Sequence, residues 1–485
     1  MHALPQMRRN VPIRRCPTAQ TWKQDRVSVK ELVGTFNKGV NEMTAEKIER
    51  KYTPEINPKE IEELKNSVKT ASAKIIADTI ERMKKSDPKR PEAMKYFDGI
   101  ADLFGQRPEE IAAAKAKGKK VIGYSCLFAP IELILAADAI PVRVNSGWFD
   151  TAKLGDRVVP VEVCPVIRST LGAAMIGLSP FLEQSDALIS VLTCDGMTKF
   201  GEIMSDYKPI WGMNIPRVKD APHSLRFWNE EIKQIKTQLE KLTGNKITRN
   251  SLKEAIEQTQ RATRAFRRLQ DLRKSQPVIM GRDAMLVTQS YLWDDKVRWT
   301  EKTEALCSEL EARAKRQDWV CPPDTPRVML TGTPMFWPDN WKLPTLVEEA
   351  NPRGIIVADE LCSGERILND PVGVDEWTMD DMLNAIGERH LMASTCPCFT
   401  SKDGNEDRIN WLINKVKENN IQGVIYYVVR GCMLYAMEYS RVKKALDKIG
   451  IPVYYLDTEY TREDVGQLKT RVEAFLEMLT ARVDL

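Results

Sequence analysis

Cysteines are the residues of this sequence whose type and spacing most clearly favour chemistry. Of the ten cysteines, seven recur in two groups, within which successive positions are roughly 30–40 residues apart, about the length of one strand–helix–strand unit. The first group is Cys126, Cys164 and Cys194, and the second is Cys362, the pair Cys396 and Cys398, and Cys432. This spacing differs from the paired CxxC knuckles of a zinc ribbon, and it can bring three thiolates together once in each half.

The rest of the composition limits the metal chemistry of such thiolates. Only three histidines are present, and none stands at ligand spacing from another. A centre built from thiolates favours an iron–sulfur cluster or zinc over iron held by histidine and carboxylate. Three thiolates per half would leave one iron of a cubane open to a substrate or a bridging atom.

An ordinary structural role is the alternative for each cysteine. A single buried cysteine at the end of a strand is usually a small core residue. Here six or seven such cysteines lie within a few residues of glycine, proline or aspartate, which favours ligation of a cluster over chance. Cys16, Cys307 and Cys321 lie outside the pattern, and we interpret them as ordinary thiols.

The composition is that of a soluble globular protein large enough for two or three domains. The chain has 485 residues, of which 42% are hydrophobic and 29% charged, and its formal net charge is +4. This small charge does not call for nucleic acid or membrane lipid as a partner. No apolar run reaches the length of a membrane span, and the basic first residues lack the apolar stretch of a secretory signal. We therefore expect a cytoplasmic protein.

Hydrophobic periodicity indicates the elements that must position the cysteines. Residues 1–118 form a predicted helical extension, with a helix start at Asn57-Pro58. Strands then alternate with helices over 119–222, helices dominate 223–325, and the alternation returns over 326–485. The sequence therefore predicts an α/β fold: two similar doubly wound parallel-sheet domains with a helical segment between them and an N-terminal helical extension. In such sheets ligands bind at the carboxyl ends of the strands, where we expect the cysteines.

Several segments resemble the benzoyl-CoA reductase and 2-hydroxyacyl-CoA dehydratase superfamily. The first-half segments are GYSCLFAPIELILAADAIPVRV, VCPVIRSTLG and TCDGMTK, and the closing segment is DTEYTREDVGQLKTRVEAFLEML. The resemblance runs from about residue 119 to residue 485, and it leaves the preceding extension unexplained.

Within that superfamily, the second-half cysteines resemble those of the double-cubane cluster proteins. These are homodimers in which each chain holds two 4Fe-4S cubanes joined by a bridging sulfide. The resemblance implies one cubane on Cys126, Cys164 and Cys194, and the other on Cys362, Cys398 and Cys432. Cys396 is an alternative to Cys398 as ligand, or a neighbouring thiol.

The resemblance also implies partners and a reaction. An ATP-hydrolysing iron–sulfur activator protein would supply low-potential electrons under anaerobic conditions, and the substrate would be a small unsaturated molecule. Glu132 would line the active cavity and move protons; the alternative is a carboxylate that interacts with the start of a helix. Arg168, Lys199 and Arg430 would offset the charge of the cluster, or lie on the surface as ordinary cations.

Three functions remain in competition. The first is an iron–sulfur oxidoreductase with a double-cubane cluster. The second is a subunit of a 2-hydroxyacyl-CoA dehydratase, which is a lyase, or of an aryl-CoA reductase, with a CoA thioester as substrate and a single 4Fe-4S cluster. The third is a scaffold or maturation protein that holds a cluster without turnover. Iron content separates the first two, because two cubanes contain about eight irons and one contains about four.

Overall fold

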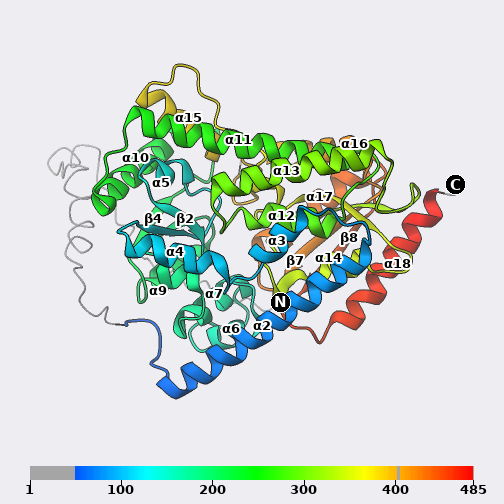
Figure 1. The fold of residues 1–485 in the computed structure, drawn as a ribbon, viewed down its shortest axis with the longest axis horizontal. Coiled ribbons are helices and arrows are strands. Elements are labelled where there is room, and N and C mark those ends of the chain that lie inside the picture. The colour runs from blue at the N-terminus through cyan, green and yellow to red at the C-terminus, as the bar shows by residue number, and fades with distance from the viewer. Residues whose placement is uncertain (1–49, 401–404, 484–485) are drawn as a thin grey trace, which may run out of the picture. The chain divides into compact units, whose positions relative to one another are not determined.

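The computed structural model describes residues 50–400 and 405–483, so Cys16 lies outside the described residues. These residues contain two four-stranded parallel sheets (Figure 1). The first has the strand order β2-β1-β3-β4 and consists of β1 (Val121–Tyr124), β2 (Ile140–Arg143), β3 (Ala187–Leu192) and β4 (Ile210–Asn214). The second has the order β6-β5-β7-β8 and consists of β5 (Arg327–Gly332), β6 (Ile355–Glu360), β7 (Gly423–Val429) and β8 (Val453–Thr458). The predicted fold class is confirmed.

In both sheets, the direction in which successive strands are added reverses at the same place in the strand order. The chain moves from the first strand of each sheet to one side, and then crosses to the other side for the third strand. The switch points therefore lie between β1 and β3 and between β5 and β7, where open α/β sheets bind ligands.

Helices surround both sheets. The first sheet is accompanied by α5 (Ile131–Ala136), α6 (Phe149–Gly155), α7 (Pro165–Met175), α8 (Pro180–Gln184) and α9 (Asp195–Met204). The second is accompanied by α14 (Lys342–Glu348), α15 (Met379–Leu391), α16 (Glu406–Glu418), α17 (Met433–Asp447), α18 (Val465–Val483) and the short 3-10 helices η2 (Asp339–Trp341) and η3 (Glu365–Ile367).

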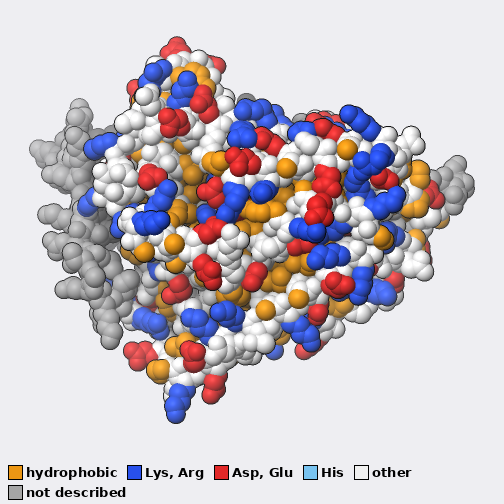
Figure 2. All heavy atoms as spheres, in the orientation of Figure 1, with side chains coloured by type: hydrophobic (Ala, Val, Ile, Leu, Met, Phe, Trp, Pro, Cys, Tyr) orange, Lys and Arg blue, Asp and Glu red, His pale blue; other side chains and the backbone are white. Residues whose placement is uncertain are grey.

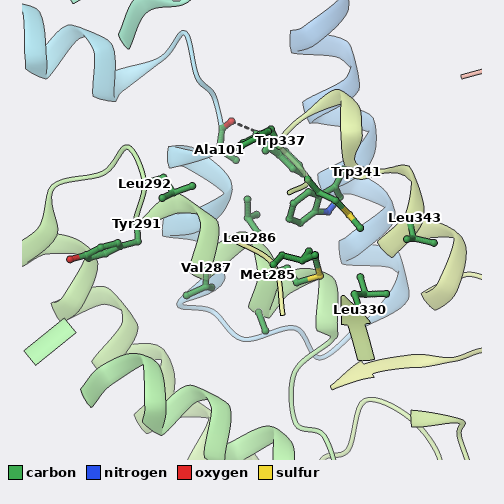
Figure 3. Close-up of a cluster of buried hydrophobic side chains, with 14 of the residues drawn as sticks. Ala101, Met285, Leu286, Val287, Tyr291, Leu292, Leu330, Trp337, Trp341 and Leu343 are labelled. Atoms are coloured by element: carbon green, nitrogen blue, oxygen red, sulfur yellow. Dashed lines mark hydrogen bonds between the residues drawn. The ribbon is translucent and has the colours of Figure 1, made fainter. Parts of the chain in front are cut away.

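Four helices link the two sheets along the chain. They are α10 (Ser224–Thr243), α11 (Arg249–Lys274), α12 (Gly281–Ser290) and α13 (Lys296–Lys315). Side chains of both charge signs are interspersed on the visible face over α11 and α13 (Figure 2), where Arg261 pairs with Glu304 at 2.6 Å. In contrast, every residue of α12 is buried. Its side chains Met285, Leu286 and Val287 pack near Leu330 and Trp337 in the interior (Figure 3).

The helices that precede the first sheet belong to the same apolar core. They are α2 (Pro58–Ser86), α3 (Met94–Ile100) and α4 (Gln106–Ala116). Asn57 caps α2 by accepting a hydrogen bond from the Lys59 N–H, as its sequence predicts. Trp148 donates to Ser72 Oγ of α2 at 3.1 Å, and Trp337 donates to the Ala101 carbonyl at 2.8 Å (Figure 3). The boundaries of the four predicted parts stay predictions.

None of the helices within residues 50–400 and 405–483 has the length and apolar character needed to cross a membrane. The cytoplasmic location stays a prediction.

A glycine brings a loop of one half against a loop of the other. Gly431 follows β7 with a φ of +88°, in the left-handed region that favours glycine. A Cβ atom at this position would lie 2.3 Å from the Glu162 carbonyl oxygen and 3.0 Å from the Cys164 nitrogen. Only glycine therefore permits this approach of the two loops.

Replacement of Ser72 by alanine tests the attachment of α2 to the rest of the protein. Ser72→Ala leaves the buried Trp148 N–H without its acceptor, so we expect the free energy of unfolding to fall by about 1–3 kcal/mol. Ser67→Ala, on the exposed side of α2, is the matched control and should change it by less than about 0.5 kcal/mol. Chemical denaturation measures both variants, and equal effects would contradict the packing described for α2.

Replacement of Gly431 by alanine tests the approach of the two loops. Gly450 also has a positive φ, +77°, but no atom lies within 4 Å of a Cβ built there. Gly450→Ala should therefore cost only the backbone strain, about 1–2 kcal/mol. Gly431→Ala should cost a further ~1–3 kcal/mol from overpacking. Equal unfolding midpoints for the two variants would show that the loops are not in contact.

Candidate functional site

Four of the seven predicted cysteines follow strands, as expected. Cys126 comes just after β1 and Cys194 just after β3, so these two flank the switch point of the first sheet. Cys362 follows β6, and Cys432 follows β7 at the switch point of the second sheet. Their positions agree with ligand binding at the carboxyl ends of parallel strands.

The other three cysteines reach the site from elements other than strands. Cys164 is the residue before the first turn of α7, and Cys396 and Cys398 lie in the loop between α15 and α16. The expectation that Cys164, Cys396 and Cys398 stand at strand ends is wrong, because the helix α6 precedes the loop of Cys164 and the helix α15 precedes the loop of Cys396 and Cys398. Pro165 fixes the first turn of α7 and so orients Cys164.

One group of thiols consists of Cys164, Cys194 and Cys432. The Cys432 thiol donates a hydrogen bond to the Cys164 sulfur, which lowers the pKa of Cys164 and raises that of Cys432. Burial raises the pKa of Cys194, and the negative charge of Cys164 raises it further. The Met197 N–H donates to Cys194 Sγ at 3.4 Å. This group therefore combines cysteines from both sheets.

A second group consists of Cys126, Cys362, Cys396 and Cys398. The Cys398 thiol donates to Cys396, which lowers the pKa of Cys396 to about 6 and raises that of Cys398. Burial raises the pKa of Cys126 to about 12, and the charges of Cys362 and Cys396 contribute to the increase. Cys396 also raises the pKa of Cys194, so the two groups are neighbours. The thiols of both halves thus share one region.

The donor set fits a multi-iron cluster better than a single ion. Within residues 50–400 and 405–483, no three or more His, Cys, Asp or Glu side chains are arranged to hold one metal ion. A cluster spaces its thiolate ligands more widely than one ion does, because each thiolate binds a different iron. The seven thiols provide such a set of soft ligands.

Buried positive charge lies beside the second group of thiols. Burial raises the pKa of Cys362, and the guanidinium of Arg366 opposes this increase; the same guanidinium contributes to the lowered pKa of Cys396. Its Nη1 donates to the Tyr435 hydroxyl at 3.0 Å, whereas its Nη2 is buried without a hydrogen bond of good geometry. Arg143 donates to the Cys362 carbonyl oxygen at 2.8 Å, and its charge opposes the raised pKa of the Cys362 thiol.

The carboxylate of Glu360 lies near two buried guanidinium groups, those of Arg366 and Arg408. Glu360 is 2.9 Å from Arg408 and 3.6 Å from Arg366, and all three side chains are buried. It also accepts a hydrogen bond from Thr331 at 2.7 Å. Arg408 has a second carboxylate, Glu438, at 3.5 Å. Arg366, in contrast, lies beside the shared Glu360 with its Nη2 buried and not hydrogen-bonded, so the site favours a further negatively charged group near Arg366.

The three cations predicted from the sequence have different surroundings. Arg168 is buried, pairs with Asp156 and Glu459, and lowers the pKa of Cys164. The side chain of Lys199 is 74% exposed and pairs with Glu202, and that of Arg430 is 64% exposed. Only Arg168 among the three is a buried charge at the site.

Glu132 is a buried residue in the first turn of α5, where the sequence predicts a helix start. Its partner is His390 of α15, with 3.4 Å between Glu132 Oε2 and His390 Nε2. Sequence reasoning missed His390, Arg366 and Arg143. For His390 and Arg366 the available signal was their position, because each is within a few residues of a predicted ligand.

Comparisons with known proteins identify the family. The family model described as 2-hydroxyglutaryl-CoA dehydratase, D-component, matches residues 126–479. The protein YjiM of Escherichia coli (strain K12), named as a dehydratase subunit, is 30% identical over 75% of this chain and 93% of its own length. The (R)-phenyllactyl-CoA dehydratase beta subunit of Clostridium sporogenes is 25% identical over 79% of this chain and 99% of its own. One of the benzoyl-CoA reductase subunits of Thauera aromatica is 23% identical over 72% of this chain and 88% of its own. This chain therefore belongs to the family of the 2-hydroxyglutaryl-CoA dehydratase D-component, within the superfamily that its cysteine segments resemble.

Proposed function

We propose that this protein is an iron–sulfur enzyme that reduces a small unsaturated substrate with low-potential electrons from a double-cubane cluster. The observation that carries the proposal is the approach of seven thiols from both halves of the chain, in two neighbouring groups. The names of the relatives, dehydratase and reductase subunits, support an enzyme subunit of this general class. When bound, the cluster would supply single electrons to the substrate.

The contacts between thiols favour one division of the ligands. We propose Cys164, Cys194 and Cys432 for one cubane, and Cys126, Cys362 and Cys396 for the other. Cys396 is favoured over Cys398 because Cys396 interacts with the thiols of Cys126, Cys194 and Cys362 and so lies among the other proposed ligands. The division by halves, with Cys398 as ligand, is the alternative from sequence resemblance. The two divisions differ in whether Cys362 and Cys432 bind the same cubane.

Arg366, Arg143 and Arg168 would stabilise the negative charge of the cluster and its thiolates. Each is a buried cation that lowers the pKa of at least one thiol of the site. Stabilisation of thiolates favours metal binding, because a thiol must lose its proton to become a ligand. These arginines would also raise the potential of the cluster, since reduction adds negative charge.

The partners remain part of the proposal. An ATP-hydrolysing iron–sulfur activator would deliver the electrons, and two copies of the chain would form a homodimer. The substrate would be a small molecule, and no nucleic acid or membrane partner is proposed. Support comes from the relatives, which are named as subunits of dehydratases and of a reductase.

A dehydratase or aryl-CoA reductase subunit with one 4Fe-4S cluster is the second candidate. The names of the relatives favour it directly. It leaves three or four of the clustered thiols without a ligand role, which is the argument against it. A scaffold without turnover would bind iron and show no substrate reduction when activator, ATP and a reductant are supplied.

Iron content tests the cluster and the division of its ligands. We expect about eight irons per chain after anaerobic purification, and about half after Cys362→Ala or Cys432→Ala. The double variant separates the divisions: about four irons remain if both cysteines bind one cubane, and fewer if they bind different cubanes. Cys307→Ala is the control, because Cys307 is buried between α11 and α13 and should leave the iron unchanged. About four irons in the unaltered protein would support the single-cluster candidate, and an iron-free protein would refute both.

Removal of the Arg366 charge tests its electrostatic role. Arg366→Gln should lower the midpoint potential of the cluster by about 60 mV, which corresponds to a tenfold change in equilibrium for one electron. Arg430→Gln is the control, since Arg430 lies close in sequence to Cys432 but its side chain is largely exposed. Redox titration followed by electron paramagnetic resonance measures both. Equal potentials in the two variants would contradict a role for Arg366 at the cluster.

A further inference from the structure

Two buried titratable groups from different halves of the chain meet beside the cysteine site. Glu132 is 2% exposed and His390 is 1% exposed, and their Oε2 and Nε2 atoms are 3.4 Å apart. One lies on α5 of the first half, and the other on α15 of the second half. Both side chains are polar and contribute no apolar packing to the core. Their burial therefore favours a role that depends on their hydrogen bonds and charge.

A neighbouring arginine determines which nitrogen of His390 carries the proton. Arg389 Nη1 is 3.0 Å from His390 Nδ1. A guanidinium can only donate hydrogen bonds, so Nδ1 must be the acceptor. The proton of the neutral imidazole is therefore on Nε2, which points at Glu132.

Arg389 is itself held in place by the backbone. Its Nε donates to the Asp370 carbonyl at 3.0 Å, and its Nη2 donates to the Ile367 carbonyl at 2.7 Å. With both other donor sites occupied, the guanidinium is fixed in the orientation that presents Nη1 to His390. The tautomer of His390 is thus set by three hydrogen bonds of one side chain.

The charges near the pair agree with a neutral imidazole and a carboxylate. Burial and then Arg389 lower the pKa of His390, and these effects exceed the opposite effect of Glu132. Burial raises the pKa of Glu132, but the interactions with His390 and Arg389 outweigh it, so the pKa is lowered overall. Tyr124 and Tyr291 also face Glu132, and burial raises the pKa of both hydroxyls, which therefore stay protonated.

A small cavity connects His390 with the two loops that carry cysteines. Its volume is about 20 Å³, enough for one water molecule. His390, Arg366 and Asp370 line it, together with Leu127, which follows Cys126, and Thr395, which precedes Cys396. Arg366, Asp370 and Arg389 are the charged groups that line this space with His390.

We propose that His390, oriented by Arg389, is the positioning residue that holds Glu132 ionised and aimed as a proton acceptor beside the cluster. A neutral imidazole cannot give up its Nε2 proton to a carboxylate, so the hydrogen bond stabilises the anion and keeps one oxygen of Glu132 engaged. The carboxylate is the group that takes up the proton. In this state Glu132 takes a proton from an O–H or C–H group of a bound substrate: that bond breaks, its electron pair stays on the substrate, and Glu132 becomes the neutral acid. The protons consumed in a reduction come from another donor. The inference rests on the proposed function for the identity of the site.

The tautomer can be read directly because the chain has only three histidines. In full-length, anaerobically purified protein labelled with 15N-histidine, nuclear magnetic resonance should show His390 with its proton on Nε2. Arg389→Leu should produce a mixture of tautomers. A proton on Nδ1 in the unaltered protein would overturn the proposal. His390→Leu identifies the signal by its loss.

The ionisation of Glu132 gives a second test that needs no substrate. Infrared spectra as a function of pH, with Glu132→Gln to identify the carboxylate band, should show that the pKa of Glu132 rises by about 1–2 pH units in His390→Leu. His390→Gln keeps an N–H donor at the position of Nε2 and should restore most of the shift. An unchanged pKa in His390→Leu, or a loss of the same size in both variants, would overturn the proposal. Iron is measured in the same samples, so that absence of a cluster counts against the proposed function and an unchanged pKa in iron-loaded protein counts against His390.

Discussion

The site depends on a balance of buried charge between thiols and arginines. A buried guanidinium without a negative partner is strongly unfavourable, and Arg366 shares the carboxylate of Glu360 with Arg408, which also pairs with Glu438 at 3.5 Å. The nearby thiols supply the remaining negative charge when they lose their protons. This constraint explains why a region of the protein interior that contains so many cysteines also contains several arginines. It makes the thiols part of an electrostatic unit with the arginines around them.

A rigid interior holds the loops that carry this unit. The carboxylate of Glu348 in α14 accepts hydrogen bonds from the N–H groups of Gly281 at 2.8 Å and Ile356 at 3.2 Å. It thereby joins the start of the fully buried helix α12 to β6, the strand that precedes Cys362. Apolar side chains of α12 pack beside Trp337 and Leu330 (Figure 3). The core therefore fixes the position of Cys362 through the strand that precedes it.

Contact between the two sheets arises at their loops. Gly431 of the second half lies against the backbone before Cys164, and Arg143 of the first half donates to the Cys362 carbonyl. The first contact joins two loops, and the second joins the last residue of β2 to the loop after β6. A cluster held by both halves would therefore be sensitive to any motion between them, and such a motion offers a physical route by which a partner could alter its potential.

Local features of the sequence were sufficient to predict the fold class and the strands that precede Cys126, Cys194, Cys362 and Cys432. Period-two and helical patterns, caps such as Asn57, and glycine turns depend on neighbouring residues, so they can be read along the chain. Only the tertiary structure decided which thiols meet, because Cys164 and Cys432 belong to loops that docking of the two halves brings together. The same holds for His390. Its contacts with Glu132 and Arg389 form only in the folded protein, where burial excludes the water that would otherwise bind these groups. Spacing along a chain carries no information on contacts between separate segments, and these contacts determine the charge and the tautomer of each group at the site.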